Sequence, residues 1–214
     1  MTPRDALERG LGELALQLPE LARRQLLQYV ALLAKWNRTY NLTAIRTQEE
    51  MISHHVLDSL AILPHLPMPG AEPALADAGS GAGLPGIPIA LARPAWRVTL
   101  VEANAKKAAF LRQAAIELGT GNLAVQEGRV EQWHPSSRFA VVASRAFAGL
   151  AQFITACRHL VAPHGVLAAM KGRDPRAELA RLPGGCACDA PIRVRVPLLE
   201  AERHLVLCRP ESKA

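Results

Sequence analysis

The sequence predicts an α/β fold in which a helical extension precedes a mostly parallel sheet, and an antiparallel hairpin finishes that sheet. Three observations predict this fold. The first 70 residues carry helical patterns only. From Ala74 onward, short β-rich runs alternate with helical runs, and the last two β-rich runs have no helix between them. Because 214 residues can bury one sizeable core, we expect a helical extension over residues 1–70 and a main domain over residues 71–214.

The helical extension opens with an N-terminal helix signal. Thr2 can cap a helix, Pro3 suits its first position, and Asp5 places an acid in the first turn. A second helix is expected after Pro19. Its apolar residues recur at helical spacing: Leu26, Tyr29, Val30, Leu33 and Trp36. This apolar face predicts that the second helix docks on the main domain.

A third helix is expected from a capping box, in which Thr47 and Glu50 cap each other's backbone amides. Its core-facing residues also recur at helical spacing: Ile52, Val56, Leu60 and Leu63. A cluster of helix-breaking residues then ends the helix and predicts a hinge into the main domain: Pro64, Pro67, Pro69 and Gly70.

The main domain should contain five parallel strands with helices between them. Strands are expected at residues 74–77, 98–101, 123–125, 139–143 and 166–170. Helices are expected at residues 87–92, 105–118, 150–160 and 175–182. Two further runs, 192–196 and 204–208, are joined by a short link and must pair antiparallel, which gives seven strands. This outline is typical of class I methyltransferases, a Rossmann-like fold, rather than of dinucleotide dehydrogenases.

The loop after the first strand is rich in glycine. Gly81, Gly83 and Gly86 satisfy the G-x-G-x-x-G pattern, in which a backbone without side chains approaches a nucleotide closely. Dinucleotide sites place a pyrophosphate on amide donors at this point. Here the acid Asp77 would repel that anion, and prolines remove amide donors from the loop. We therefore favour a cationic nucleotide-like ligand, S-adenosylmethionine, over NAD; the remaining alternative is a glycine-rich turn without a ligand.

The second strand ends in a carboxylate, Glu102, whose two oxygens match the two hydroxyls of a ribose. Since NAD and S-adenosylmethionine share that ribose, Glu102 does not distinguish between them. A solvated glutamate at a strand end is the alternative interpretation.

The positive charge is concentrated late in the chain. The formal net charge is +6, and from Arg129 to the end there are 13 basic and 7 acidic residues. A basic field on one part of a domain favours a polyanion such as nucleic acid, although ordinary solvated surface charge is an equal alternative. No apolar run is long enough to span a membrane and the N-terminus lacks a signal-peptide pattern, so we expect a cytoplasmic protein without a membrane partner.

The four cysteines do not follow a metal or redox spacing. Cys186 and Cys188 form C-x-C rather than C-x-x-C, and Cys157 and Cys208 stand apart. We expect all four to be reduced and expect no metal site.

An ordered set of motifs resembles the RsmG (GidB) family, whose members methylate N7 of a guanine in bacterial 16S ribosomal RNA, in the 530 loop. These motifs cover most of the chain: residues 35–43 (KWNRTYNLT), 55–59 (HVLDS), 77–88 (DAGSGAGLPGIP), 129–131 (RVE), 144–148 (SRAFA), 170–172 (MKG) and 202–205 (ERHL). The chain departs from the family pattern at Ala82, where proline is common, and at Glu102, where some members have aspartate. The resemblance implies a methyltransferase that uses S-adenosylmethionine and acts on 16S ribosomal RNA or a small-subunit particle. We expect the protein to be a monomer.

The resemblance also implies a donor site. Gly79 and Leu84 should contact the methyl donor, Val130 and Glu131 should flank its adenine, and Arg145 should complete the pocket. Together with the residues argued above, the expected donor-binding set is Asp77, Gly79, Gly81, Gly83, Leu84, Glu102, Arg129, Val130, Glu131 and Arg145. Arg145 could instead meet an RNA phosphate.

The expected chemistry needs no acid or base catalyst. A motif for methylating exocyclic amines is missing after the fourth strand, which reads Ser144-Arg145-Ala146, and a cysteine nucleophile is missing there too. Guanine N7 already carries a lone pair, so catalysis should consist of alignment and desolvation. We expect His55 to be packed or hydrogen bonded rather than catalytic. A small-molecule methyltransferase and an RNA-binding assembly factor with a donor pocket remain alternatives, and an NAD oxidoreductase is a weaker one.

Several basic residues are candidate RNA contacts. Arg193 and Arg195 alternate with apolar residues, so their side chains should face solvent, where they could equally protect an edge strand. Asn41 follows the second helix and could line the pocket entrance or end that helix. The expected substrate-binding set is Asn41, Arg145, Lys171, Arg173, Arg193, Arg195 and Arg203. Because the RNA major groove is deep and narrow, the target guanine should lie in a loop or a splayed conformation.

Overall fold

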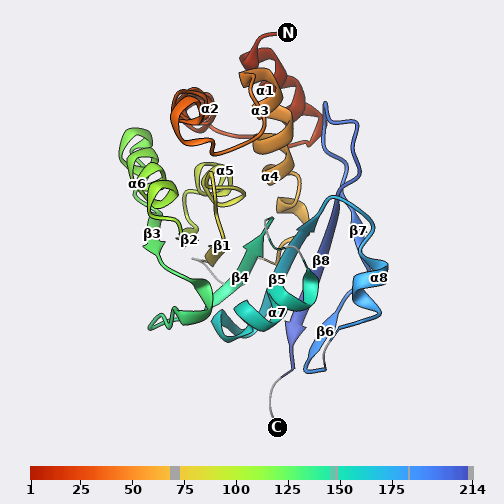
Figure 1. Ribbon diagram of the computed structural model, residues 1–214. Coiled ribbons are helices and arrows are strands. Elements are labelled where there is room, and N and C mark those ends of the chain that lie inside the picture. The colour runs from red at the N-terminus through yellow and green to blue at the C-terminus, as the bar shows by residue number, and fades with distance from the viewer. Residues whose placement is uncertain (68–72, 146, 148, 183, 212–214) are drawn as a thin grey trace.

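The computed structural model describes residues 1–67, 73–145, 147, 149–182 and 184–211. Figure 1 shows one twisted sheet with helices on both faces and the N-terminal helices gathered along one side. No helix in these ranges combines the length and the apolarity needed to cross a membrane.

The central sheet confirms the predicted fold class. Five strands run parallel to one another: β1 (Ala74–Ala78), β2 (Arg97–Glu102), β3 (Leu123–Glu127), β4 (Phe139–Ser144) and β5 (Val161–Lys171). Three strands complete the sheet by antiparallel pairing: β6 (Cys186–Cys188), β7 (Ile192–Arg193) and β8 (His204–Pro210). The order is β3-β2-β1-β4-β5-β8-β6, and β7 also pairs with β8.

The antiparallel end of the sheet differs from the prediction. Within the described residues the sheet has eight strands rather than seven, and the strand expected at 192–196 pairs over only two residues. The reason is that two short strands divide the outer edge of β8. β7 pairs with its first residues, His204 and Leu205, and β6 pairs with the stretch 208–210.

Two layers of helices bury opposite faces of the sheet. Because side chains alternate along a strand, Leu75 of β1 packs in one apolar cluster and Ala76 in the other. The first cluster lies under α5 (Gly86–Ala92), α6 (Ala105–Leu118) and the N-terminal helices, and the second lies under α7 (Leu150–Cys157). The predicted helix at 150–160 continues past α7 as the 3₁₀ turn η4 (Arg158–Leu160), and the one at 175–182 forms only the short α8 (Arg176–Leu179).

The predicted cap defines the first N-terminal helix. In α1 (Pro3–Glu13), the Thr2 side chain accepts from the Asp5 amide, and the Asp5 carboxylate accepts in return. The long α2 (Glu20–Tyr40) buries the expected face over most of its length.

The third predicted helix is interrupted. It runs as α3 (Gln48–Met51), a π-helical segment η1 (Ile52–Leu57) and α4 (Asp58–Leu60), followed by the 3₁₀ turn η2 (Leu63–His65). Its four core-facing residues are nonetheless almost fully buried. The breakers Pro64 and Pro67 follow as predicted, whereas Pro69 and Gly70 of the expected hinge lie outside the described residues.

The expectation that all cysteines are reduced is wrong for two of them. Cys188 and Cys208 form a disulfide, while Cys157 and Cys186 are free. The prediction failed because β6 was not predicted. Pairing of β6 with β8 places Cys188 directly opposite Cys208.

Candidate functional site

The carboxyl ends of the parallel strands bring the predicted site residues to one edge of the sheet. The glycine loop follows β1, Glu102 ends β2, and Arg145 follows β4. The strand order reverses between β1 and β4, and ligands of open α/β sheets bind outside the carboxyl ends at such a reversal. We refer to this region as the carboxyl edge.

The glycine loop uses its glycines in two ways. Gly79, Gly81 and Gly83 all have positive φ, of 70°, 58° and 89°, which side chains resist. A Cβ on Gly83 or Gly86 would collide with Ile87 or Leu100, so these two glycines permit close packing beneath the loop. A Cβ on Gly81 would meet nothing nearer than the Gly79 carbonyl at 3.9 Å. Of Gly81, Gly83 and Gly86, Gly81 alone has space beside its backbone for an added side-chain atom.

Asp77 lies beneath the glycine loop, at the end of β1. Its side chain is fully buried, and Oδ2 accepts a hydrogen bond from the Gly86 amide at 2.9 Å. Oδ1 is buried with no partner among the described residues. Burial raises the pKa of Asp77 to about 7, against the opposing effect of the Gly86 amide. The carboxylate therefore shapes the loop and leaves one oxygen unsatisfied.

Glu102 connects the ends of β1 and β2. Its Oε2 accepts from the Gly81 amide and its Oε1 from the Asn104 amide, both at 2.8 Å. Each carboxylate oxygen has a second lone pair, so these bonds leave acceptor capacity for a diol. The carboxylate is therefore held in a fixed orientation beside the open side of the glycine loop.

The extension reaches the glycine loop through Tyr29 of α2. This side chain is completely buried, and its hydroxyl donates to the Ala82 carbonyl at 2.7 Å. Sequence reasoning placed Tyr29 on an apolar face and missed this contact. A phenol on a core-facing helix position was the available signal, because a buried Tyr hydroxyl needs a partner.

The expected adenine-flanking residues form a 3₁₀ turn after β3, η3 (Val130–Gln132). Val130 is buried, while Arg129 and Glu131 are exposed. The Gly128 amide donates to the Glu102 carbonyl at 2.9 Å, which ties this turn to the end of β2. The structure thus brings this turn close to Glu102 at the end of β2.

Arg145 and Arg203 share one buried carboxylate, that of Asp58. Arg145 Nη1 lies 3.2 Å from Oδ2 of Asp58, and Arg203 Nε lies 2.8 Å from Oδ1. The Asp58 side chain is 2% exposed, whereas the arginines are 28% and 23% exposed. Arg145 also donates to the His54 carbonyl at 2.9 Å. With the neighbouring His55, these residues form what we call the Asp58 cluster, a pairing that the sequence analysis did not foresee.

His55 is hydrogen bonded, as predicted. Its Nε2 lies 2.8 Å from Thr43 Oγ1, and its Nδ1 lies 3.4 Å from Arg145 Nη1. Burial and, next, the Arg145 guanidinium lower the pKa of His55 to about 4. The imidazole is therefore neutral at neutral pH and serves to orient its neighbours.

The other predicted substrate contacts divide into paired and exposed groups. Lys171 is 11% exposed and forms an ion pair with Glu178 at 2.9 Å. Asn41 ends α2 in the left-handed conformation, which gives it the capping role named as an alternative. Arg173, Arg193 and Arg195 are exposed, as expected for the last two from their alternation with apolar residues.

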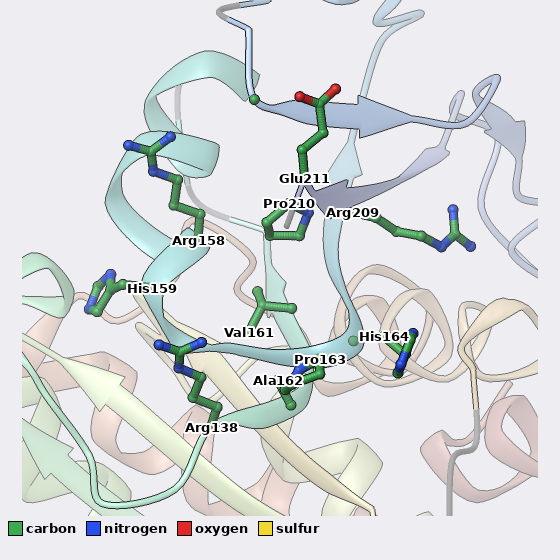
Figure 2. A pocket seen from close by; sticks show the side chains of 12 residues that line it. Arg138, Arg158, His159, Val161, Ala162, Pro163, His164, Arg209, Pro210 and Glu211 are labelled. Atoms are coloured by element: carbon green, nitrogen blue, oxygen red, sulfur yellow. The ribbon is translucent and has the colours of Figure 1, made fainter. Parts of the chain in front are cut away.

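Two cavities lie at opposite edges of the sheet. One, of about 1000 Å³, opens between α1 and the chain around β7 and is lined by Arg9, Arg193, Arg195 and Arg203. The other, of about 790 Å³, lies at the amino ends of β4 and β5, where Arg138, Arg158 and two histidines surround it (Figure 2). Only the first lies on the same edge as the glycine loop and the Asp58 cluster.

The parallel sheet with its antiparallel end, the glycine loop and the acidic end of β2 together define a class I methyltransferase fold. Solved structures support this fold. A DhpI–SAH complex is 20% identical with a TM-score of 0.57, covering 90% of this chain and 98% of that one. A precorrin-6y C5,15-methyltransferase from Geobacter metallireducens is 14% identical with a TM-score of 0.53, covering 72% and 87%.

The chain belongs to the GidB family, described as rRNA small subunit methyltransferase G, which matches residues 22–206. Relatives named ribosomal RNA small subunit methyltransferase G occur in Burkholderia pseudomallei (strain 1106a) and Burkholderia thailandensis. Each is 52% identical over 204 residues, which cover 94% of this chain and 88% of the relative. The family resemblance stated from the motifs is therefore confirmed.

Proposed function

We propose that this protein transfers the methyl group of S-adenosylmethionine to N7 of a guanine in the 530 loop of 16S ribosomal RNA, acting in the cytoplasm as a monomer. The observation that carries the proposal is the 52% identity to small-subunit rRNA methyltransferases over 94% of the chain. The substrate is structured RNA or a small-subunit particle.

The residues at the carboxyl edge fit the methyl donor. Glu102 offers two oriented oxygens to a ribose diol, and the backbone at Gly81 faces open space beside it. Val130 and Glu131 are proposed to flank the adenine, with Arg129, Gly83 and Leu84 completing the wall. The unsatisfied Oδ1 of Asp77 favours a donor group or a positive charge nearby. When bound, the donor supplies an electrophilic methyl group on a sulfonium.

The proposed chemistry requires no general base. Guanine N7 attacks through a lone pair that carries no proton, so the site must align the base and exclude water. The nearby titratable side chains suit this interpretation because they form hydrogen bonds within the protein. His55 is hydrogen bonded to Thr43, and Asp77 lies under the loop.

The RNA is proposed to lie along the carboxyl edge. Arg173, Arg193 and Arg195 are exposed there, and the cavity of about 1000 Å³ adjoins the last two. Arg145, Arg203 and Lys171 hold carboxylates in the protein, so their contribution to RNA binding is limited to their remaining N–H groups. Residues 1–70, including Asn41 at the end of α2, are proposed to act as a separate layer that supports this edge.

Methyl transfer to purified small subunits tests the proposal. Subunits come from cells that lack the protein, and the enzyme and a labelled donor are added. We expect label in 16S RNA only, at one guanine that becomes sensitive to the cleavage chemistry specific for N7-methylguanine.

The variant Glu102→Gln tests the donor site. Its side-chain amide keeps one oxygen acceptor, but it loses the negative charge and the second acceptor for the ribose diol. Donor affinity should therefore fall by about tenfold, which corresponds to about 1.4 kcal/mol.

Two outcomes would reject the proposed substrate. Equal methylation of an unstructured guanine oligomer would contradict the need for structured RNA. Donor binding without transfer to any subunit particle would favour an RNA-binding assembly factor with a donor pocket. Methyl transfer to small molecules alone would favour a small-molecule methyltransferase.

A further inference from the structure

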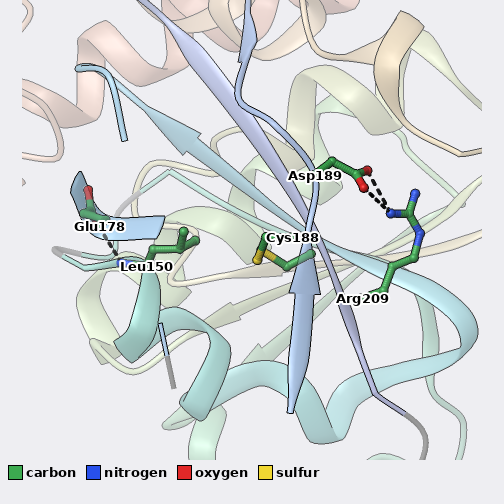
Figure 3. Close-up of a disulfide and its surroundings, with 6 residues drawn as sticks. Leu150, Glu178, Cys188, Asp189 and Arg209 are labelled. Atoms are coloured by element: carbon green, nitrogen blue, oxygen red, sulfur yellow. Dashed lines mark hydrogen bonds and ion pairs between the residues drawn. A yellow bond between two sulfur atoms is a disulfide. The ribbon is translucent and has the colours of Figure 1, made fainter. Parts of the chain in front are cut away.

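Three of the four cysteines meet at the antiparallel end of the sheet, away from the glycine loop. Cys186 and Cys188 stand two positions apart on β6, so their side chains lie on the same face of the strand. Cys208 of β8 lies directly opposite Cys188. The Sγ atoms of all three lie within 4.8 Å of one another. Figure 3 shows Cys188 of this group in its disulfide, beside the Asp189–Arg209 ion pair.

The three sulfurs lie in partly apolar surroundings. Cys208 is fully buried, and the other two pack against the apolar cluster under α7. None of these cysteines has a part in the proposed methyl transfer.

We propose that Cys186, Cys188 and Cys208, when reduced, bind one Zn²⁺ ion. Thiolates bind zinc at about 2.3 Å in tetrahedral geometry, which separates the sulfurs by about 3.8 Å. In the disulfide form the Sγ atoms of Cys188 and Cys208 are bonded, and Cys186 Sγ lies within 4.8 Å of both. Opening the disulfide and rotating the side chains can therefore bring all three sulfurs to this separation. Three protein ligands leave the fourth coordination position open. The C-x-C spacing alone did not predict this site, because its third ligand comes from another strand.

The zinc site and the disulfide exclude each other. The Cys188–Cys208 disulfide consumes two of the three ligands, so only the reduced chain can bind the ion. Hydrogen peroxide can convert the metal-free, reduced chain to the disulfide form, and a reductant such as a phosphine reverses the change. The two thiols give up two electrons and two protons, the S–S bond forms, the peroxide O–O bond breaks, and two water molecules leave. Zinc would therefore stabilise the pairing of the three-residue β6 with β8 under reducing conditions.

Metal titration of the full-length protein tests the proposal. The protein is reduced with a phosphine, kept anaerobic, loaded with ZnSO₄ and dialysed, and zinc is then measured per chain. We expect one equivalent in the reduced protein and none after peroxide treatment. Loading with Co²⁺ should give the intense near-ultraviolet charge-transfer band of thiolate ligands. Thiol titration of the denatured chain should count four thiols in the reduced protein and two after oxidation.

Serine variants identify the ligands. Zinc affinity should fall by at least about 100-fold in each of Cys186→Ser, Cys188→Ser and Cys208→Ser. Replacing a residue that only hydrogen bonds to a metal ligand already lowers metal affinity by about 10–100-fold. Cys157→Ala is the matched control, because Cys157 is buried outside the group, and it should bind zinc like the wild type. Circular dichroism before loading verifies that each variant is folded. Absence of zinc from the reduced wild type, or undiminished binding by Cys188→Ser, would overturn the proposal.

Discussion

The glycine loop and the Asp58 cluster each contain a buried aspartate, and the two are satisfied in opposite ways. Asp77 is fully buried and receives one backbone amide, while its other oxygen has no partner among the described residues. Asp58 is 2% exposed and faces two guanidinium groups. Two carboxylates of similar burial are therefore held by different kinds of partner, one by a backbone amide and the other by two guanidinium groups.

The glycine loop and the Asp58 cluster are also held in place by different kinds of contact. The loop is held mainly by backbone amides within or beside it, such as those of Gly86 and Gly81. The cluster is held by side chains from three distant segments, which join the N-terminal helices to the ends of β4 and β8. We infer that the cluster fixes the extension against the sheet, while the loop shapes the donor crevice.

The largest expected effect comes from removing the carboxylate of the cluster. Asp58→Ala leaves two partly buried arginines facing each other without a counter-charge, so the free energy of unfolding should fall by about 3–5 kcal/mol. Urea denaturation measures this loss. The control is Glu127→Ala, which breaks the exposed Arg112–Glu127 pair and should cost less than about 1 kcal/mol. Equal losses in the two variants would show that the cluster does not fix the extension.

The next effect is a pair of opposite pH dependences. The folded-state pKa of Asp77, about 7, lies above its ordinary 3.8, so its contribution to stability is full below pH 4 and is lost as the pH rises to 7. The folded-state pKa of His55, about 4, lies below its ordinary 6.5, so its contribution is full above pH 6.5 and is lost as the pH falls to 4. Each amounts to on the order of 3 kcal/mol, and in the wild type the two oppose each other.

Two variants separate these dependences. Asp77→Asn should lose stability on acidification from pH 6.5 to 4, and His55→Gln should lose stability when the pH rises from 4 to 7. The double variant provides the control and should show neither trend. Thermal unfolding across this range measures the slopes, and parallel profiles for the two single variants would refute the assignment.

A smaller effect distinguishes the two kinds of glycine. In Gly86→Ala the new methyl group collides with Leu100 and crowds Asp77, so stability should fall by about 1–3 kcal/mol. At Gly81 φ is 58°, but an added methyl group would find free space. Gly81→Ala should therefore lower the free energy of unfolding by about 1 kcal/mol and mainly weaken donor binding. Urea denaturation and donor titration by calorimetry check both. If Gly81→Ala binds the donor as the wild type does, the crevice is not beside Gly81.

An effect of similar size tests the link between the extension and the loop. Tyr29→Phe removes the donor to the Ala82 carbonyl and should cost about 1–2 kcal/mol through the buried oxygen left unpaired. Donor affinity should fall with it if the extension supports the loop. Tyr40→Phe, an exposed position on the same helix, is the control and should leave stability and donor affinity unchanged.

The sequence alone determined the features that depend on residues close together in the chain. The Thr2 and Asp5 cap, the helix at 105–118 and the β1 loop with its glycines all match the structure, because caps, periodicity and positive φ are local properties. The motifs also identified the family. The predicted strands also indicated that Glu102 lies beside the glycine loop, because the carboxyl ends of neighbouring parallel strands meet at the same edge of a sheet.

Only the tertiary structure decided which side chains meet across the fold. Arg145 and Arg203 reach Asp58 over 87 and 145 residues of chain, and Cys188 meets Cys208 through a strand of three residues that carried too little pattern to predict. Such contacts depend on the packing of whole elements, and a charge or thiol in the sequence does not specify its partner. For this reason the sequence located the site, while the fold determined that two of its predicted arginines are bound to a buried aspartate.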